Sequence, residues 1–345
     1  MSPASSSGRE PLAAIFGLAG TALSAAERNL FRDADPLGFI LFQRNCENPD
    51  QVRELVARLR DCVDRGDAPV LIDQEGGRVA RLRPPHWREY PAAATLAAVA
   101  QPRAAVFLAA RLIAHDLATL GITVDCAPVL DLAFAGTDPV IGDRAYGANP
   151  ATVAELGRAA CEGLLAGGVL PIIKHIPGHG RATVDSHKAL PVVTASRREL
   201  DETDFAPFRA LNGMPWAMTA HIVYRAIDPD RPATLSPRLI GETIRASIGF
   251  DGMLISDDLS MAALPGTLAE RAKGALDAGC DVVLHCNGNQ AEMMAIAASI
   301  GPLTPAARRR LARGEAQRRV DDRVGSSFDR EAAVARLAAL IGMSE

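Results

Sequence analysis

Three of the chain's seven histidines lie in one short segment that also contains a lysine and an aspartate. The segment is residues 174–191, KHIPGHGRATVDSHKALP, and its histidines are His175, His179 and His187. Such a cluster is compatible with a metal site, with a phosphate-binding loop, or with a loop that carries an acid–base catalyst. The rest of the sequence must decide between these kinds of site.

A metal site is disfavoured by the local sequence. His175 and His179 have the i, i+4 spacing that places two ligands on one face of a helix, but the Pro-Gly pair between them opposes a helix. The first apolar run, IFGLAG, ends without any metal-ligating side chain. We therefore predict that the protein holds no catalytic metal.

Phosphate binding and serine chemistry are also weakly supported. PGHG does not fit the GxxxxGK[ST] pattern of a phosphate loop, and the chain has no GxSxG motif for a nucleophilic serine. In an extended segment Ser186 points away from the side that Asp185 and His187 share. No other motif calls for a cofactor, and we predict none.

Hydrolysis of a glycosidic bond fits the residues better. It needs a carboxylate near the anomeric carbon and a proton donor for the leaving oxygen. Asp257 in SDDLSM is a candidate nucleophile, and only one of Asp257 and Asp258 can point into the mouth of a barrel because adjacent strand residues face opposite ways. His187 is a candidate proton donor, since the i, i+2 spacing lets Asp185 bind its ring and hold its tautomer.

The elements that position these residues are short apolar runs separated by amphipathic stretches. The runs are AAIFGLAG, GFILFQRN, APVLIDQEGG, ITVDCAPVLDL, VLPIIKHIPG, WAMTAHIVY, GMLISDDLSM and DVVLHCNG. Helices are predicted at 50–65, 102–120, 151–166, 236–247 and 267–279. Eight β–α alternations predict an α/β protein with a (β/α)8 TIM barrel, whereas a doubly wound sheet would favour GxGxxG after its first strand.

Polar residues gather where the apolar runs end. They are Gln43, Arg44, Asn45, Asp73, Gln74, Glu75, Asp131, Lys174, His175, His221, Asp257, Asp258, His285 and Asn287. Parallel strands buried on both faces should be apolar throughout, so polar ends on seven of eight strands indicate an active site at the C-terminal end of the barrel.

The domain organisation follows from the same pattern. We expect residues 1–345 to form one catalytic domain, with the barrel at about 11–300 and extra C-terminal helices at about 302–345 packed outside it. No linker-like composition shift marks a second domain. Thr267, with Glu270 three residues later, predicts a capped helix start.

Composition excludes several classes of partner. The net charge is −4, which favours neither nucleic acid nor an acidic membrane, and no run is apolar and long enough to span a bilayer. The six cysteines form no CxxC pair and lie mostly in apolar runs, as expected in a reducing compartment. We expect a cytoplasmic, monomeric protein.

Four motifs occur in an order that resembles the family 3 glycoside hydrolases, and within them the bacterial β-N-acetylglucosaminidases of cell-wall recycling. They are DQEGGRVARLR, GDRAYG, KHIPGHGRATVDSH and SDDLSM, within a resemblance that runs from about Phe16 to Asn287. It implies a retaining exo-β-N-acetylglucosaminidase (a β-hexosaminidase) that acts on a small carbohydrate, terminal β-linked GlcNAc of muropeptides.

The resemblance also implies roles for single residues. It makes Asp257 the nucleophile, His187 the acid/base and Asp185 its partner, and it assigns contacts with sugar hydroxyls to Asp73, Arg81, Arg144, Lys174 and His175. Three alternatives stay open at this point. They are a phosphorylase or other β-glycosidase with the same intermediate, substrate-assisted chemistry through the acetamido group, and a barrel that binds sugar without catalysis.

Overall fold

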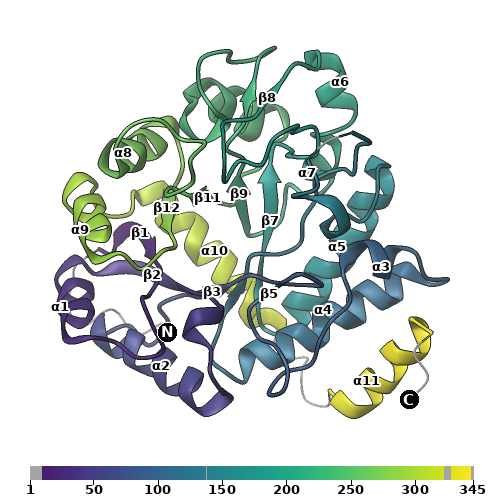
Figure 1. Ribbon diagram of the computed structural model, residues 1–345, viewed down its shortest axis with the longest axis horizontal. Coiled ribbons are helices and arrows are strands. Elements are labelled where there is room, and N and C mark those ends of the chain that lie inside the picture. The colour runs from purple at the N-terminus through teal and green to yellow at the C-terminus, as the bar shows by residue number, and fades with distance from the viewer. Residues whose placement is uncertain (1–9, 137, 322–327, 343–345) are drawn as a thin grey trace.

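A closed barrel of eight parallel strands forms the centre of the molecule (Figure 1). The computed structural model describes residues 10–136, 138–321 and 328–342. Around the barrel the strands follow the order β1-β12-β11-β9-β7-β6-β3-β2. They are β1 (Leu12–Phe16), β2 (Pro36–Leu41), β3 (Val70–Ile72), β6 (Val124–Asp125), β7 (Leu170–Ile176), β9 (Trp216–Thr219), β11 (Met253–Asp258) and β12 (Val282–His285). The predicted (β/α)8 barrel is confirmed, and each predicted apolar run overlaps one of these strands.

The strands are apolar because both of their faces are buried. In β1, Ala13 and Ile15 belong to the apolar cluster inside the barrel, whereas Ala14 and Phe16 belong to the cluster between strands and helices. All of these residues are buried, so alternation along the strand separates two apolar surroundings rather than core and solvent. The interior is thus a packed core, and space for a ligand remains only at an end of the barrel.

Helices surround the barrel (Figure 1). The α-helices are α1 (Ala25–Ala34), α2 (Pro49–Cys62), α3 (Ala93–Ala97), α4 (Pro102–Ala118), α5 (Pro150–Ala166), α6 (Arg197–Glu202), α7 (Ala206–Ala210), α8 (Leu268–Ala278), α9 (Gln290–Ser299), α10 (Pro305–Asp321) and α11 (Arg330–Leu340). Short 3₁₀ turns are η1 (Gln43–Asn45), η2 (Gly142–Arg144) and η3 (Ala233–Leu235).

Four of the five predicted helices are α-helices, and the fifth differs in type. The segment predicted as a helix at 236–247 forms a π-helix, η4 (Leu239–Ser247), at whose end the Ile248 N–H donates to the Thr243 carbonyl five residues earlier, at 2.8 Å. The predicted start of α8 is confirmed. The Thr267 side chain accepts from the Glu270 N–H, and the Glu270 carboxylate accepts from the Thr267 N–H at 2.8 Å.

The two C-terminal helices, α10 and α11, contact different parts of the barrel. Helix α10 crosses the N-terminal end of the barrel, and Leu303, Ala307 and Leu311 pack into the same apolar cluster as Trp216 on β9 (Figure 1). These side chains cover the interior core from below, so α10 packs on the end of the barrel rather than among the helices that surround it. Helix α11 lies outside the barrel and begins just after Phe328. The guanidinium carbon of Arg111 on α4 lies 3.8 Å from the centroid of the Phe328 ring.

Two small two-stranded ribbons lie outside the barrel sheet. One pairs β4 (Gln74–Gly76) with β5 (Val79–Ala80), and the other pairs β8 (Val192–Val193) with β10 (Val223–Tyr224). The Gln74 side chain holds the first ribbon together, since its Oε1 accepts from the N–H groups of Arg81 and Leu82 at 2.9 and 3.0 Å. This ribbon therefore fixes the backbone that carries Arg81.

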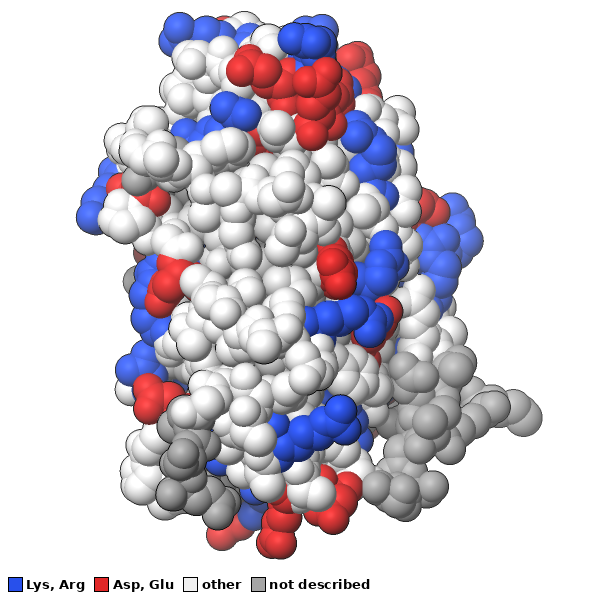
Figure 2. Space-filling model, turned by 90° about the vertical axis from the view of Figure 1, so that its right-hand side faces the viewer, with Lys and Arg blue, Asp and Glu red and all other residues white. Residues whose placement is uncertain are grey.

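The outer surface mixes both signs of charge. Figure 2 shows one side of the molecule, where acidic and basic side chains alternate with broad uncharged areas and form no extended basic surface. None of the helices in the described ranges combines the length and the apolar content that crossing a bilayer requires.

Candidate active site

The C-terminal ends of the barrel strands surround a cavity of about 210 Å³. Seven of the eight residues predicted for the site line it, namely Asp73, Arg81, Arg144, Lys174, His175, His187 and Asp257. The eighth, Asp185, stands behind His187. A larger cavity of about 890 Å³ lies between α1 and α9, but it contains none of the predicted groups and its lining is mainly apolar. The smaller cavity is therefore the candidate active site.

Lys174 is the centre of a buried charge network at this end of the barrel. Its Nζ lies 2.9 Å from Oδ1 of Asp73, and Arg81 donates to the other oxygen of Asp73, also at 2.9 Å. Burial by itself would raise the pKa of Asp73, but the charges of Lys174 and Arg81 outweigh it and hold that pKa well below its usual range. The carboxylate is therefore ionised and able to accept hydrogen bonds from a ligand.

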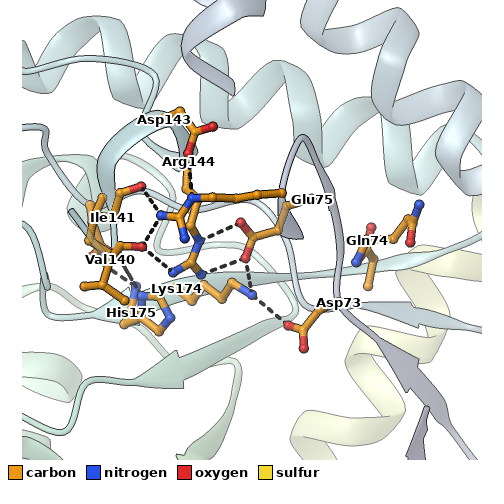
Figure 3. A network of polar contacts seen from close by, with 12 residues as sticks. Asp73, Gln74, Glu75, Val140, Ile141, Asp143, Arg144, Lys174 and His175 are labelled. Carbon is orange, nitrogen blue, oxygen red and sulfur yellow. Dashed lines mark hydrogen bonds and ion pairs between the residues drawn. The ribbon is translucent and has the colours of Figure 1, made fainter. Parts of the chain in front are cut away.

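Glu75 completes the network and was not among the predicted site residues. Arg144 binds it with two hydrogen bonds of 2.8 Å, and Lys174 Nζ lies 2.7 Å from Oε1 (Figure 3). Burial raises the pKa of Glu75, but these two cations lower it to about 2. Asp73 and Glu75 alternate with Gln74 along one extended segment, and this i, i+2 spacing was the available sequence signal.

The loop before Arg144 is held by Arg78, which lies between β4 and β5. Arg78 donates to the Asp143 carboxylate at 2.8 Å and to the Val140 carbonyl at 2.6 Å. Arg144 donates to the same carbonyl at 3.1 Å (Figure 3). The β4–β5 ribbon and the 140–144 loop are thus joined. These hydrogen bonds between the ribbon and the loop keep Arg144 beside Glu75.

His175 is oriented by Asp131, a second carboxylate that the prediction left out of the site. Nδ1 of His175 lies 2.6 Å from Oδ2 of Asp131, and the His175 N–H donates to Oδ1 at 3.1 Å. Burial raises the pKa of Asp131, whereas His175, the larger of the opposing influences, brings it below its usual value. With Nδ1 engaged, Nε2 of His175 is the ring atom left to face the cavity.

Asp257 and Asp258 end β11 and differ in what surrounds them. The Asp258 carboxylate is occupied, because it accepts from the Cys286 N–H at 3.2 Å and from the Ser260 hydroxyl at 2.5 Å. Among the described residues Asp257 accepts one hydrogen bond, from the Asp258 N–H at 2.8 Å. Burial raises the pKa of Asp257, but interactions with His175 and His221 bring it below its usual value. Asp257 is therefore an ionised carboxylate with an oxygen available to the cavity.

Asp185 and His187 form a hydrogen-bonded pair on the loop that follows β7. Nδ1 of His187 lies 2.8 Å from Oδ1 of Asp185, which also accepts from the His187 N–H at 2.9 Å. The side chain of His187 is 64% exposed and that of Asp185 is 16% exposed. Because Nδ1–H is directed at the carboxylate, Nε2 is the atom of His187 that can exchange a proton with a ligand.

The described residues contain no group of three or more His, Cys, Asp and Glu side chains arranged to hold a metal ion. The histidines of 174–191 have separate partners instead: His175 binds Asp131, His187 binds Asp185, and His179 binds Ser186.

An eight-stranded barrel with an ionised carboxylate at a strand end, and an imidazole–carboxylate pair on a loop beside it, has the groups that glycosidic bond hydrolysis requires. The sequence comparison agrees and gives the family. Residues 13–320 match the Glycosyl hydrolase family 3 N terminal domain. The chain belongs to glycosyl hydrolase family 3.

Relatives within this family are similar over most of their length. The Beta-hexosaminidase of Alkalilimnicola ehrlichii is 43% identical over 286 residues, which cover 80% of this chain and 81% of that protein. The Beta-hexosaminidase of Pseudomonas aeruginosa is 39% identical over 316 residues, covering 90% and 93%. Among solved structures, NagZ from Neisseria gonorrhoeae in complex with N-trifluoroacetyl-D-glucosamine has a TM-score of 0.85 at 32% identity, covering 96% and 98%.

Proposed function

We propose that the protein is a retaining exo-β-N-acetylglucosaminidase that removes terminal β-linked GlcNAc from muropeptides. The observation that carries the proposal is the shared cavity, in which Asp257 and His187, backed by Asp185, line the same space. The similarity to proteins named Beta-hexosaminidase, and to a neighbour that binds an N-acylated glucosamine, supports the sugar class.

The mechanism assigns the attack to Asp257 and the proton transfer to His187. An oxygen of Asp257 attacks the anomeric carbon, and the bond to the leaving oxygen breaks. The leaving oxygen keeps the electron pair and takes the proton from Nε2 of His187. In the second step neutral His187 removes a proton from water, the water oxygen attacks the anomeric carbon, and Asp257 departs. Two inversions retain the β configuration.

Asp185 keeps the imidazole in its working orientation. Burial raises the pKa of Asp185, but the hydrogen bonds from His187 lower it below its ordinary value, so the carboxylate is ionised. It holds Nδ1 as the donor and stabilises the imidazolium that must form between turnovers. After the proton is delivered His187 is neutral, so the proton donor itself carries no negative charge beside the glycosyl–enzyme.

The charge network binds the sugar in this proposal. Asp73, Arg81, Arg144, Lys174 and His175 lie around the cavity floor, and the ionised carboxylate and the cations can bind sugar hydroxyls with charge-assisted hydrogen bonds. Such bonds raise kcat to the extent that they strengthen in the transition state. We further propose that residues 1–345 act as one monomeric catalytic domain, in the cytoplasm and in cell-wall recycling.

A panel of nitrophenyl glycosides tests the proposal. We expect turnover of the β-GlcNAc glycoside, unchanged when phosphate is added, and no turnover by Asp257→Ala. Acceleration by phosphate with formation of a sugar phosphate would favour the phosphorylase alternative. Appreciable turnover by Asp257→Ala would remove Asp257 as the nucleophile.

His187→Ala separates the acid role from binding. Since a good leaving group departs without a proton, kcat/KM for a dinitrophenyl glycoside should fall little, whereas kcat/KM for a GlcNAc disaccharide should fall by about 10²–10⁴-fold. Equal losses on both substrates would argue against proton donation by His187.

A further inference from the structure

His179 lies in the active-site cavity, yet the mechanism gives it no task. Its side chain is buried, and its backbone N–H donates to Oδ1 of Asp131 at 2.6 Å. The centroid of its ring lies 5.4 Å from that of His175. Nε2 of His179 lies 3.2 Å from the hydroxyl of Ser186, and Nδ1 is buried without a partner. Asp131 thus fixes the backbone of His179, and the ring of His179 points at Ser186 on the loop.

That residue stands between the two members of the acid/base pair. Along the loop, Ser186 is buried whereas the side chains of Asp185 and His187 turn to the other side and are partly or largely exposed. The Ser186 carbonyl also accepts from the Ala263 N–H at 3.2 Å, which ties the loop to the segment after β11. The tripeptide 185–187 is therefore held to the barrel through its middle residue.

The protonation state of His179 is compatible with a hydrogen bond from its ring to Ser186. Burial and the neighbouring His175 lower the pKa of His179 to about 4, so the ring is neutral near pH 7. In the tautomer with the proton on Nε2, the ring donates to the Ser186 hydroxyl and leaves Nδ1 as a bare acceptor. The other tautomer would leave a buried N–H without an acceptor, and orphaned donors are the rarer case in folded proteins.

We propose that His179 is a positioning residue for the acid/base pair and acts through its hydrogen bond to Ser186. The inference rests on the proposed function, in which His187 transfers the proton. Asp131 then aligns two groups at once, since one carboxylate orients the ring of His175 and fixes the backbone of His179. The same buried aspartate therefore helps to position both the sugar site and the proton donor on the loop.

Ser186→Ala tests the proposal with the smallest change, because it removes only the hydroxyl. The assay is kcat/KM for a dinitrophenyl glycoside and for a GlcNAc disaccharide, since kcat/KM reports the step in which the leaving group needs its proton. We expect a loss of about 10-fold on the disaccharide and less than about 2-fold on the dinitrophenyl glycoside, a weaker form of the His187→Ala pattern. Ser299→Ala, at the remote end of α9, is the matched control and should change neither value.

A second variant and a double-mutant cycle separate positioning from general damage. His179→Leu should reproduce the selective loss, and His179→Gln, whose amide can reach toward Ser186, should recover part of it. In the His187→Ala background, Ser186→Ala should cause no further selective loss, because the proton donor is already gone. Thermal unfolding followed by circular dichroism should show each variant folded at the assay temperature.

The possible failures are distinguishable. If His187→Ala is selective for the poor leaving group and Ser186→Ala is not, the positioning role of His179 is wrong and the proposed function stands. Equal losses on both substrates for Ser186→Ala would also overturn the positioning role. If His187→Ala itself shows no selectivity, the acid/base assignment falls and this inference falls with it.

Discussion

Glu75→Gln should destabilise the protein in a manner that depends on pH. The amide has the shape of the protonated acid, so the substitution removes charge and little else, and it leaves Lys174 and Arg144 buried with one carboxylate fewer. The pKa of Glu75 falls from its ordinary 4.5 to about 2 in the fold. At about 1.4 kcal/mol per pKa unit, the carboxylate is favoured by about 3 kcal/mol over the neutral acid.

The sign of the pH dependence follows from the lowered pKa. Because the pKa of Glu75 is lower in the folded protein, the unfolded chain binds more protons between about pH 4.5 and pH 2, and the stabilisation is lost as the pH falls through that range. Glu75→Gln should therefore lower the free energy of unfolding by about 3 kcal/mol at about pH 7 and by about 2 kcal/mol at about pH 3.5. The cost at neutral pH also agrees with that of removing one partner from a buried ion pair.

Urea unfolding followed by circular dichroism measures both values. The matched control is Glu54→Gln on α2, where the Glu54 side chain is 63% exposed and its ion pair with Arg58 lies in solvent, so the expected change is under about 1 kcal/mol. A loss below about 1 kcal/mol for Glu75→Gln at about pH 7 would refute the reasoning. So would a loss that does not shrink at about pH 3.5.

Three further predictions concern packing, capping and reactivity. Gly180→Ala should disrupt the loop after β7 and reduce activity, because an added Cβ would lie 2.1 Å from the Leu132 carbonyl oxygen; activity equal to the parent would contradict this contact. Thr267→Ala should lower the free energy of unfolding by about 1 kcal/mol through loss of the α8 cap, with kcat/KM unchanged. Burial raises the pKa of Cys126 and of Cys286 well above the ordinary value, so native protein should resist iodoacetamide at both thiols at about pH 8, and mass spectrometry of labelled peptides would reveal an exception.

The barrel could be predicted because its strands carry a double signal in the sequence. Seven of the eight strands lie in apolar runs that end in polar residues, and this pattern places Asp73, Lys174 and Asp257 at one end of the barrel. The location of α10 had a weaker signal. Leu303, Ala307 and Leu311 recur every four residues, which marks an apolar face, but nothing local says that this face covers the barrel floor rather than an outer helix.

The predicted site residues have side chains that line the cavity or, like Asp185, act on a neighbour two residues away. Glu75 and Asp131 do their work through other residues, by holding the cations and the histidines that face the cavity, and such roles depend on contacts between distant segments. Ser186 lies between Asp185 and His187 with its side chain on the other side, as the alternation predicts, but its partner His179 is seven residues away across a turn. The π-helical form of Leu239–Ser247 likewise has no local signal in its amphipathic pattern.

The central claim is that Asp257 forms a covalent bond to the sugar. Its most direct test is incubation with a 5-fluoro GlcNAc glycoside that keeps the acetamido group and has a good leaving group, followed by mass spectrometry of the intact protein and its peptides. Fluorine slows both steps and the good leaving group restores the first, so the account predicts a protein heavier by one fluoroglycosyl unit, with the label on the peptide that contains Asp257. Release of the leaving group without any labelled protein, as attack by the acetamido oxygen would give, or a label on another residue, would contradict it.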